Sequence, residues 1–224
     1  MVSGPVQIRV WDWTVRLFHW SLVVLIAAMW WTAEEGHMGW HKWLGLGLVA
    51  LLTYRVVWGV IGPKTARLLS LVPTPNRLIV YIRSIRSEPY VPSVGHNPLG
   101  SLSVIALLTV VFVQVVSGLF AVDVDGLFSG WLGRFVSFDL GRTFAEFHET
   151  TFNVLVALIG LHVLAILAYL VFLKTNLVSA MITGKQARDT EPKNYEPVDA
   201  SPFRVIVSAL VALSVVWLII SFGG

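Results

Sequence analysis

Residues 148–174 read HETTFNVLVALIGLHVLAILAYLVFLK and carry two histidines, His148 and His162, fourteen positions apart. Fourteen residues make almost four helical turns, so on an α-helix both imidazoles lie on one face, about 21 Å apart along the axis. An ionisable side chain in such an apolar run is costly in lipid unless it meets a partner. The spacing therefore predicts one helix with two functional positions at different depths.

The composition of the chain indicates an integral membrane protein. Hydrophobic residues make up 56% of the 224 residues and charged residues only 13%, with a mean hydropathy of +0.75. This balance excludes a soluble fold. A membrane-crossing helix needs about 20 apolar residues, and five runs meet that length: 15–33, 43–61, 101–122, 152–172 and 205–222. The predicted fold class is an all-α integral membrane protein with five transmembrane helices.

Basic and acidic residues alternate between the loops. Arg9 and Arg16 precede or begin the first span, the loop after the second span has five basic residues against Glu88, and the loop after the fourth has four more. The other two loops are mainly acidic. Because cytoplasmic loops are enriched in Lys and Arg, we predict a cytoplasmic N-terminus and a periplasmic C-terminus. Membrane topology, and not nucleic acid as a partner, then accounts for the net charge of +3.

Histidine is the candidate ligand type, because the chain contains no cysteine. Iron–sulfur clusters, thiolate ligation of haem and covalent haem attachment through cysteine are therefore excluded. Four of the six histidines fall in or at the edge of the predicted spans, and four is the number that two bis-histidine haems need. The direction of each helix pairs them by depth: His41 with His148 near the outer surface, and His19 with His162 further inward.

The two remaining histidines leave alternatives open. His37 lies one turn before His41 and is its rival as a ligand, a contact for an outer haem propionate, or simply solvated. His96 lies in the motif GHNPLG just before the third span. We expect His96 to cap that helix or to contact a propionate, and not to bind iron.

Three further residues within the spans point to a cofactor or to helix packing. Gly45 lies one turn after His41, where a missing side chain would let a porphyrin face approach the backbone; tight helix packing is the alternative. Arg55 is fourteen residues after His41, on the same helix face. Its positive charge could pair with a haem propionate, or its side chain could snorkel to the membrane interface. The side-chain amide of Gln114, within an apolar run, requires a hydrogen-bond partner, either a group on a neighbouring helix or the carbonyl of a quinone.

Several motifs together resemble the bacterial di-haem cytochrome b561 family, which includes the cytochrome b subunits of nickel–iron hydrogenases. The resemblance runs from about residue 9 to residue 185. It is carried by VRLFHW at 15–20, HKWLGLGLVALLTYRVVWGVIG at 41–62, GHNPLG at 95–100, VQVVSGLF at 113–120, FHETTFNVLVALIGLHV at 147–163 and NLVSAMITGK at 176–185.

The resemblance implies a four-helix transmembrane bundle that holds two b-type haems in a bacterial inner membrane. Its iron ligands carry over to His19, His41, His148 and His162. The implied function is electron transfer between the quinone pool and a periplasmic partner, either a c-type cytochrome or an oxidoreductase subunit. Whether the chain acts alone, as a quinone-linked oxidoreductase, or as a membrane subunit stays open.

The chain departs from a minimal four-helix core by its last span. We predict three parts: a di-haem cytochrome b domain at 1–185, a cytoplasmic linker at 186–201 and an additional C-terminal transmembrane helix at 202–224. The fifth helix has no histidine.

Two alternatives from other classes compete with the haem hypothesis. The intramembrane histidines could hold zinc, copper or iron in a metal-ion transporter or metal-binding subunit, because imidazole suits these metals. No internal repeat, no paired intramembrane carboxylates and no proline within the spans accompany them, although transporters commonly show repeats and broken helices. The third hypothesis is a structural anchor whose histidines bond neighbouring helices.

Overall fold

The computed structural model describes residues 6–85, 92–188 and 198–223. Its long helices confirm the predicted all-α membrane fold, because each of the five is long and apolar enough to cross a bilayer. They are α1 (Trp13–Glu34), α2 (Met38–Ile61), α4 (Pro98–Phe120), α5 (Phe138–Phe172) and α7 (Pro202–Gly223). Helix α5 begins fourteen residues before the predicted span, and its 35 residues reach about 52 Å, well beyond a hydrocarbon core of about 30 Å.

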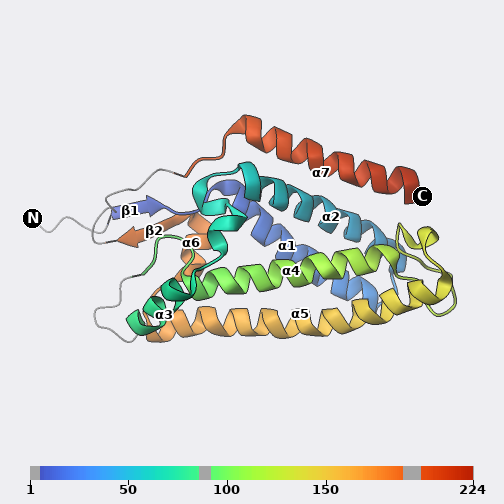
Figure 1. Cartoon of the computed structure of the whole chain (residues 1–224), viewed down its shortest axis with the longest axis horizontal. Coiled ribbons are helices and arrows are strands. Elements are labelled where there is room, and N and C mark those ends of the chain that lie inside the picture. Colours follow the sequence, from blue (N-terminus) through green and yellow to red (C-terminus); the bar gives the residue numbers. More distant parts are fainter. Residues whose placement is uncertain (1–5, 86–91, 189–197, 224) are drawn as a thin grey trace, which may run out of the picture.

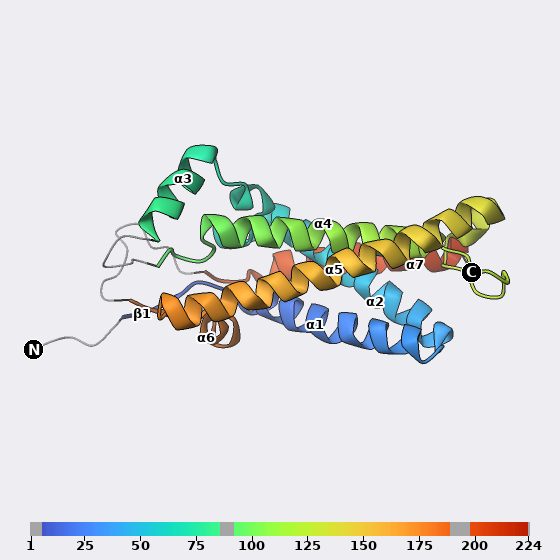
Figure 2. The same cartoon turned by 90° about the horizontal axis from the view of Figure 1, so that it is seen from below.

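Four of the helices form a bundle around a buried aliphatic layer. Leu52 of α2, Val111 of α4 and Leu155 of α5 are its fully buried members, and Leu22 and Ile26 of α1 pack against them. Helices α4 and α5 lie side by side along most of their length, as do α1 and α2 (Figure 2). The bundle therefore has one apolar centre to which all four helices contribute.

Helix α7 packs along α2, on the outside of this bundle (Figure 1). Ser208 and Ala212, four residues apart, are its buried side chains, with exposed fractions of 0% and 4%. Small residues at this spacing let two helix backbones approach closely in a membrane. The fifth transmembrane helix is thus a layer added to the four-helix bundle.

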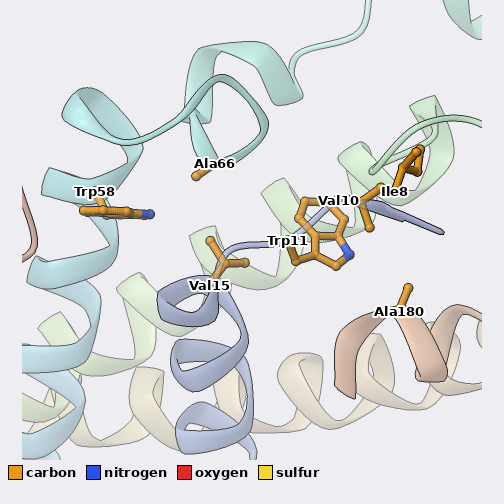
Figure 3. Packing of buried hydrophobic residues seen from close by; sticks show 7 residues of the cluster. All are labelled: Ile8, Val10, Trp11, Val15, Trp58, Ala66 and Ala180. Atoms are coloured by element: carbon orange, nitrogen blue, oxygen red, sulfur yellow. The ribbon is translucent and has the colours of Figure 1, made fainter. Parts of the chain in front are cut away.

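A small sheet closes one end of the bundle. Strand β1 (Val6–Arg9) pairs antiparallel with β2 (Lys185–Arg188), and α6 (Leu177–Thr183) precedes β2. Trp11, Val15, Trp58 and Ala180 pack together beneath the strands (Figure 3). We call this end the sheet end and the opposite end, formed by residues 121–137, the loop end.

Short elements connect the helices. The 3₁₀ turns η1 (Lys64–Ala66) and η2 (Leu68–Leu71) follow α2, η3 (Gly133–Phe135) precedes α5, and α3 (Pro75–Ser84) is an amphipathic helix at the sheet end. The sheet was not predicted, and it changes the start of the predicted linker: residues 186–188 belong to β2. Residues 189–197 of that linker lie outside the described residues. The three-part division of the chain stays a prediction.

Helix α1 begins at a buried acidic cap. The Asp12 carboxylate accepts hydrogen bonds from the backbone N–H groups of Thr14 and Val15, at 2.8 and 3.0 Å, and from the Trp58 indole at 3.3 Å. It thereby satisfies two of the unpaired N–H groups of the first turn. The bond to Trp58 ties the start of α1 to the end of α2.

Two serines of α7 give a matched test of the α2–α7 contact. Ser208 and Ser214 both donate a hydrogen bond to the carbonyl four residues earlier, but Ser208 is buried and Ser214 is exposed. We expect Ser208→Leu to overpack the contact, at a cost of about 1–3 kcal/mol, and to lower the melting temperature by several degrees. The same change at Ser214 should leave thermal unfolding in detergent unchanged. An equal response of both variants would contradict the packing described.

Candidate functional site

The four candidate histidines come from three helices. His19 lies on α1 near the sheet end, His41 lies on the first turn of α2 near the loop end, and α5 carries both His148 and His162. Because α5 is continuous between them, its two imidazoles occupy levels about 21 Å apart. Leu155 of the buried aliphatic layer lies midway, seven residues from each.

At the loop end the rings of His41 and His148 lie next to each other. Their centroids are 6.3 Å apart and their planes are inclined by 82°. The two residues are 107 positions apart in sequence, so only the packing of the bundle brings them together. A gap of this size between two rings is wide enough for one metal ion bound by both.

Backbone carbonyl groups fix the orientation of both rings. Nδ1 of His41 lies 2.9 Å from the carbonyl oxygen of Met29 on α1, and Nδ1 of His148 lies 2.8 Å from that of Gln114 on α4. A carbonyl oxygen only accepts, so Nδ1 carries the proton and donates in each case. Nε2 is then left with a lone pair, which is the arrangement usual for metal-binding histidines.

Small and polar residues of α4 hold the His148 ring. The Ser117 hydroxyl lies 3.2 Å from Nδ1 of His148, and the Thr151 hydroxyl donates to the Gln114 side-chain oxygen. At Gly118 an added Cβ would lie only 2.8 Å from Cε1 of His148. The Gln114 side chain therefore links α4 to α5, which is the helix-joining role expected from the sequence. Its backbone carbonyl supports His148.

At the sheet end, His19 and His162 lie close enough to interact electrostatically. Nδ1 of His162 is 3.3 Å from the Ser103 hydroxyl of α4. Nδ1 of His19 is buried without a hydrogen-bond partner among the described residues. The sheet end thus has two histidines, like the loop end, but the structure shows fewer hydrogen bonds that fix the orientation of their rings.

Arg55 and His96 border the sheet-end level. Arg55 is only 4% exposed; its guanidinium donates to the Ala66 carbonyl at 2.9 Å and lies 5.9 Å from the centre of the Phe18 ring. His96 packs on Trp11, with ring centroids 4.3 Å apart. Burial, with smaller contributions from the charges of Arg55 and His162, lowers the pKa of His96 to about 4. His96 is therefore neutral at physiological pH. Of these two residues, Arg55 is the one that brings a positive charge to the sheet end.

Gly45 and His37 lie near the loop-end pair. Around Gly45 the nearest neighbour of an added Cβ would be Met29 Cε, at 3.8 Å, so the space beside this turn of α2 is open. His37 is exposed, precedes α2 and packs on Trp31, at 5.5 Å between ring centroids. In the described part of the chain, no three His, Asp or Glu side chains cluster in a way that could hold a metal ion by themselves.

The prokaryotic cytochrome b561 family model matches residues 10–184, more than three quarters of the chain. The chain belongs to this family. Family members are membrane b-type cytochromes that bind haem b and transfer electrons, which agrees with the resemblance carried by the sequence motifs. No match was found among curated proteins or among solved structures. The family match ends before α7, which is therefore an addition to the matched region.

The loop-end pair of this cytochrome fits a haem. A metal–imidazole bond is about 2 Å long and a ring nitrogen lies about 1 Å from the ring centre, so two axial imidazoles have centroids about 6 Å apart. The distance between His41 and His148 is 6.3 Å. With Nδ1–H of each ring bonded to a carbonyl, both Nε2 atoms are available to one iron.

Gly118 offers a test of the His148 support. We expect Gly118→Ala to push the His148 ring away from the Gln114 carbonyl, because the new Cβ would lie 2.8 Å from the ring. Haem per polypeptide, measured by pyridine haemochrome, should fall below the wild-type value. Gly39→Ala is the control, because a Cβ there meets nothing within 4 Å although His41 is two residues away. Unchanged haem content in Gly118→Ala would contradict this role of the glycine.

Proposed function

We propose that this cytochrome carries electrons across a bacterial inner membrane between the quinone pool and a periplasmic redox partner, through two haems b. His41 and His148 hold one haem, and His19 and His162 hold the other. The proposal is supported mainly by the geometry at the loop end. The ring centroids of His41 and His148 are 6.3 Å apart, and Nδ1 of each ring is hydrogen-bonded to a backbone carbonyl. The partner is a c-type cytochrome or an oxidoreductase subunit.

Each residue type has a distinct part in this function. Haem b, when bound, supplies a one-electron iron couple. A pair of imidazoles would leave the iron no site for oxygen, which favours electron transfer over oxygen binding, and the backbone carbonyls would keep the rings basic and aligned. Arg55 and His96 remain our proposed contacts for a propionate at the sheet end, His37 for one at the loop end. Gly45 leaves space for the porphyrin face.

The charges at the two ends support an orientation with the sheet end in the cytoplasm. Lys64, Arg67, Lys174 and Lys185 lie on segments at the sheet end, while Asp123, Asp125 and Asp139 lie at the loop end. Because basic residues concentrate on the cytoplasmic side, the loop end would face the periplasm. The acidic loop end would then attract a basic redox partner.

Haem stoichiometry tests the assignment of ligands. The wild-type protein should contain two haems b per chain, and His148→Ala and His162→Ala should each retain one, because each removes one axial ligand of a different pair. The remaining haem should differ in reduction potential between the two variants, since the two levels have different surroundings. Asn153→Ala, at an exposed position of α5 between the two ligand histidines, serves as the control and should retain both haems. One haem in the wild-type protein, or two in either ligand variant, would refute the four-ligand assignment.

A cavity of about 330 Å³ between α1 and α2, at the loop end, is a candidate site for a quinone that exchanges electrons directly with the loop-end pair; it lies on the same side as the proposed partner, so transfer across the membrane needs a quinone that reacts at the sheet-end pair. Ala28, Trp31, Thr32, His37, Trp40 and Leu44 line it. Its walls are apolar and aromatic, and its side facing lipid is open because Trp31 and Trp40 are 56% and 70% exposed. The Thr32 hydroxyl also lies 3.4 Å from Nδ1 of His41, so the cavity adjoins the loop-end pair. A lipid-soluble ring with polar substituents matches this lining.

Variants of two exposed tryptophans, one inside and one outside the cavity lining, test whether this cavity binds the quinone. Trp40→Ala removes a wall of the cavity, whereas Trp30→Ala removes an indole that is 54% exposed and outside the lining. We expect Trp40→Ala to slow haem reduction by a quinol about tenfold in stopped-flow measurements, because a contact of about 1.5 kcal/mol is lost. Trp30→Ala should react at the wild-type rate. Equal rates in all three proteins would place the quinone elsewhere.

A further inference from the structure

A second cavity, of about 180 Å³, lies at the sheet end, and its lining residues include none of the candidate histidines. It is formed by the chain that leads into α1, by the junction of α6 with β2, and by residues 198–200. Its charged lining residues are Arg9, Asp12, Arg16, Lys185 and Asp199. Neither the haem ligands nor the candidate quinone cavity uses any of these side chains.

The two acidic residues of this cavity already have partners. Asp199 pairs with Arg9 at 2.6 Å. Asp12 faces inward, where it caps α1 and accepts from Trp58. In the part of the chain that the structure describes, this leaves Arg16 and Lys185 as the cavity's cations that no carboxylate neutralises. The cavity therefore has an excess of positive charge.

Arg16 is held in place but lacks one acceptor. Its Nη1 donates to the Ile182 carbonyl at 2.6 Å, at the C-terminal end of α6. Its Nε is buried and has no hydrogen-bond partner among the residues that the structure describes. The approach of α6 to Arg16 depends on Gly184, which has φ +78° and would place a Cβ 3.1 Å from Nε. A fixed guanidinium with an unused N–H is suited to an oxyanion such as phosphate.

The surface next to this cavity is apolar. Trp13, Leu17, Trp20 and Val24 follow one another at helical spacing along α1 and are 51%, 58%, 41% and 66% exposed. Ile182, on α6 beside Arg16, is 58% exposed. Because α1 is long and apolar enough to cross a membrane, these exposed side chains would face lipid. An occupant with its phosphate in the cavity would have acyl chains along this stripe.

We propose that the Arg16–Lys185 cavity binds the headgroup of an anionic phospholipid, whose acyl chains lie along the exposed stripe of α1. Arg16 supplies a guanidinium charge that is held at the cavity wall, and Lys185 supplies a second positive charge. The adjoining apolar stripe favours a lipid over a free anion. Because Arg9 and Lys185 are paired residues of β1 and β2, a bound lipid also bridges the two segments that close the sheet end.

Native mass spectrometry of the haem-loaded protein in detergent tests this site. Phosphatidylglycerol should bind more tightly than phosphatidylcholine, whose choline group would meet the excess positive charge. A basic residue near a membrane surface contributes about 1 kcal/mol to binding an anionic lipid, so Lys185→Gln and Arg16→Gln should each weaken phosphatidylglycerol binding about fivefold. Arg77→Gln, an exposed cation of α3 outside the cavity, should bind like the wild type.

Lys185→Gln is the decisive variant, because Lys185 is exposed and the substitution keeps its backbone pairing with Arg9. Haem content and the melting temperature of each variant check that the fold is retained. Equal binding of the two lipids, or an equal loss in Lys185→Gln and Arg77→Gln, would overturn the proposal. The last measurement uses inorganic phosphate as the ligand. Saturable phosphate binding that depends on Lys185, without lipid binding, would show a site for free anions and would also overturn the lipid proposal.

Discussion

A buried imidazole is costly unless its ring nitrogens find partners, and at the loop end the four helices of the bundle together meet that requirement. At the loop end, α2 and α5 supply the rings of His41 and His148, while α1 and α4 supply the carbonyl groups of Met29 and Gln114. All four helices of the bundle are therefore needed to orient one pair of rings. Helix α7 takes no part in these bonds, which agrees with its position outside α2 and beyond the family match.

The transmembrane fold was predictable because apolar runs are local in sequence. The five predicted spans correspond to five helices, and each observed helix begins before the predicted start. The largest difference is α5, where Phe138–Thr151 contains Asp139, Glu146 and Glu149 and so does not read as a membrane span. Hydropathy detects where lipid begins, whereas a helix continues as long as its backbone bonds do. The pairing of β1 with β2 joins residues about 180 positions apart and has no comparable local signal.

The candidate site was predictable only where residue type carries information. Histidines in an apolar run are visible in the sequence, and alternating helix direction suggests which of them share a depth. The supporting groups are different in kind. The carbonyls of Met29 and Gln114 are backbone atoms that any residue provides, and the close approach of Gly118 to His148 exists only after α4 and α5 have packed. Haem stoichiometry and the ligand roles rest on the proposal and its experiments.

The aliphatic layer of Leu52, Val111 and Leu155 has a consequence for energy conversion. These three side chains lie between the two histidine levels and contain no group that could relay a proton. Under the proposed function, an electron that crosses this layer travels without a proton, so each passage moves net charge through the low-dielectric part of the bilayer. A full crossing is worth about 2.3 kcal/mol for every 100 mV of membrane potential. The voltage across the membrane thereby enters the driving force of the reaction, and turnover in energised membranes should depend on it.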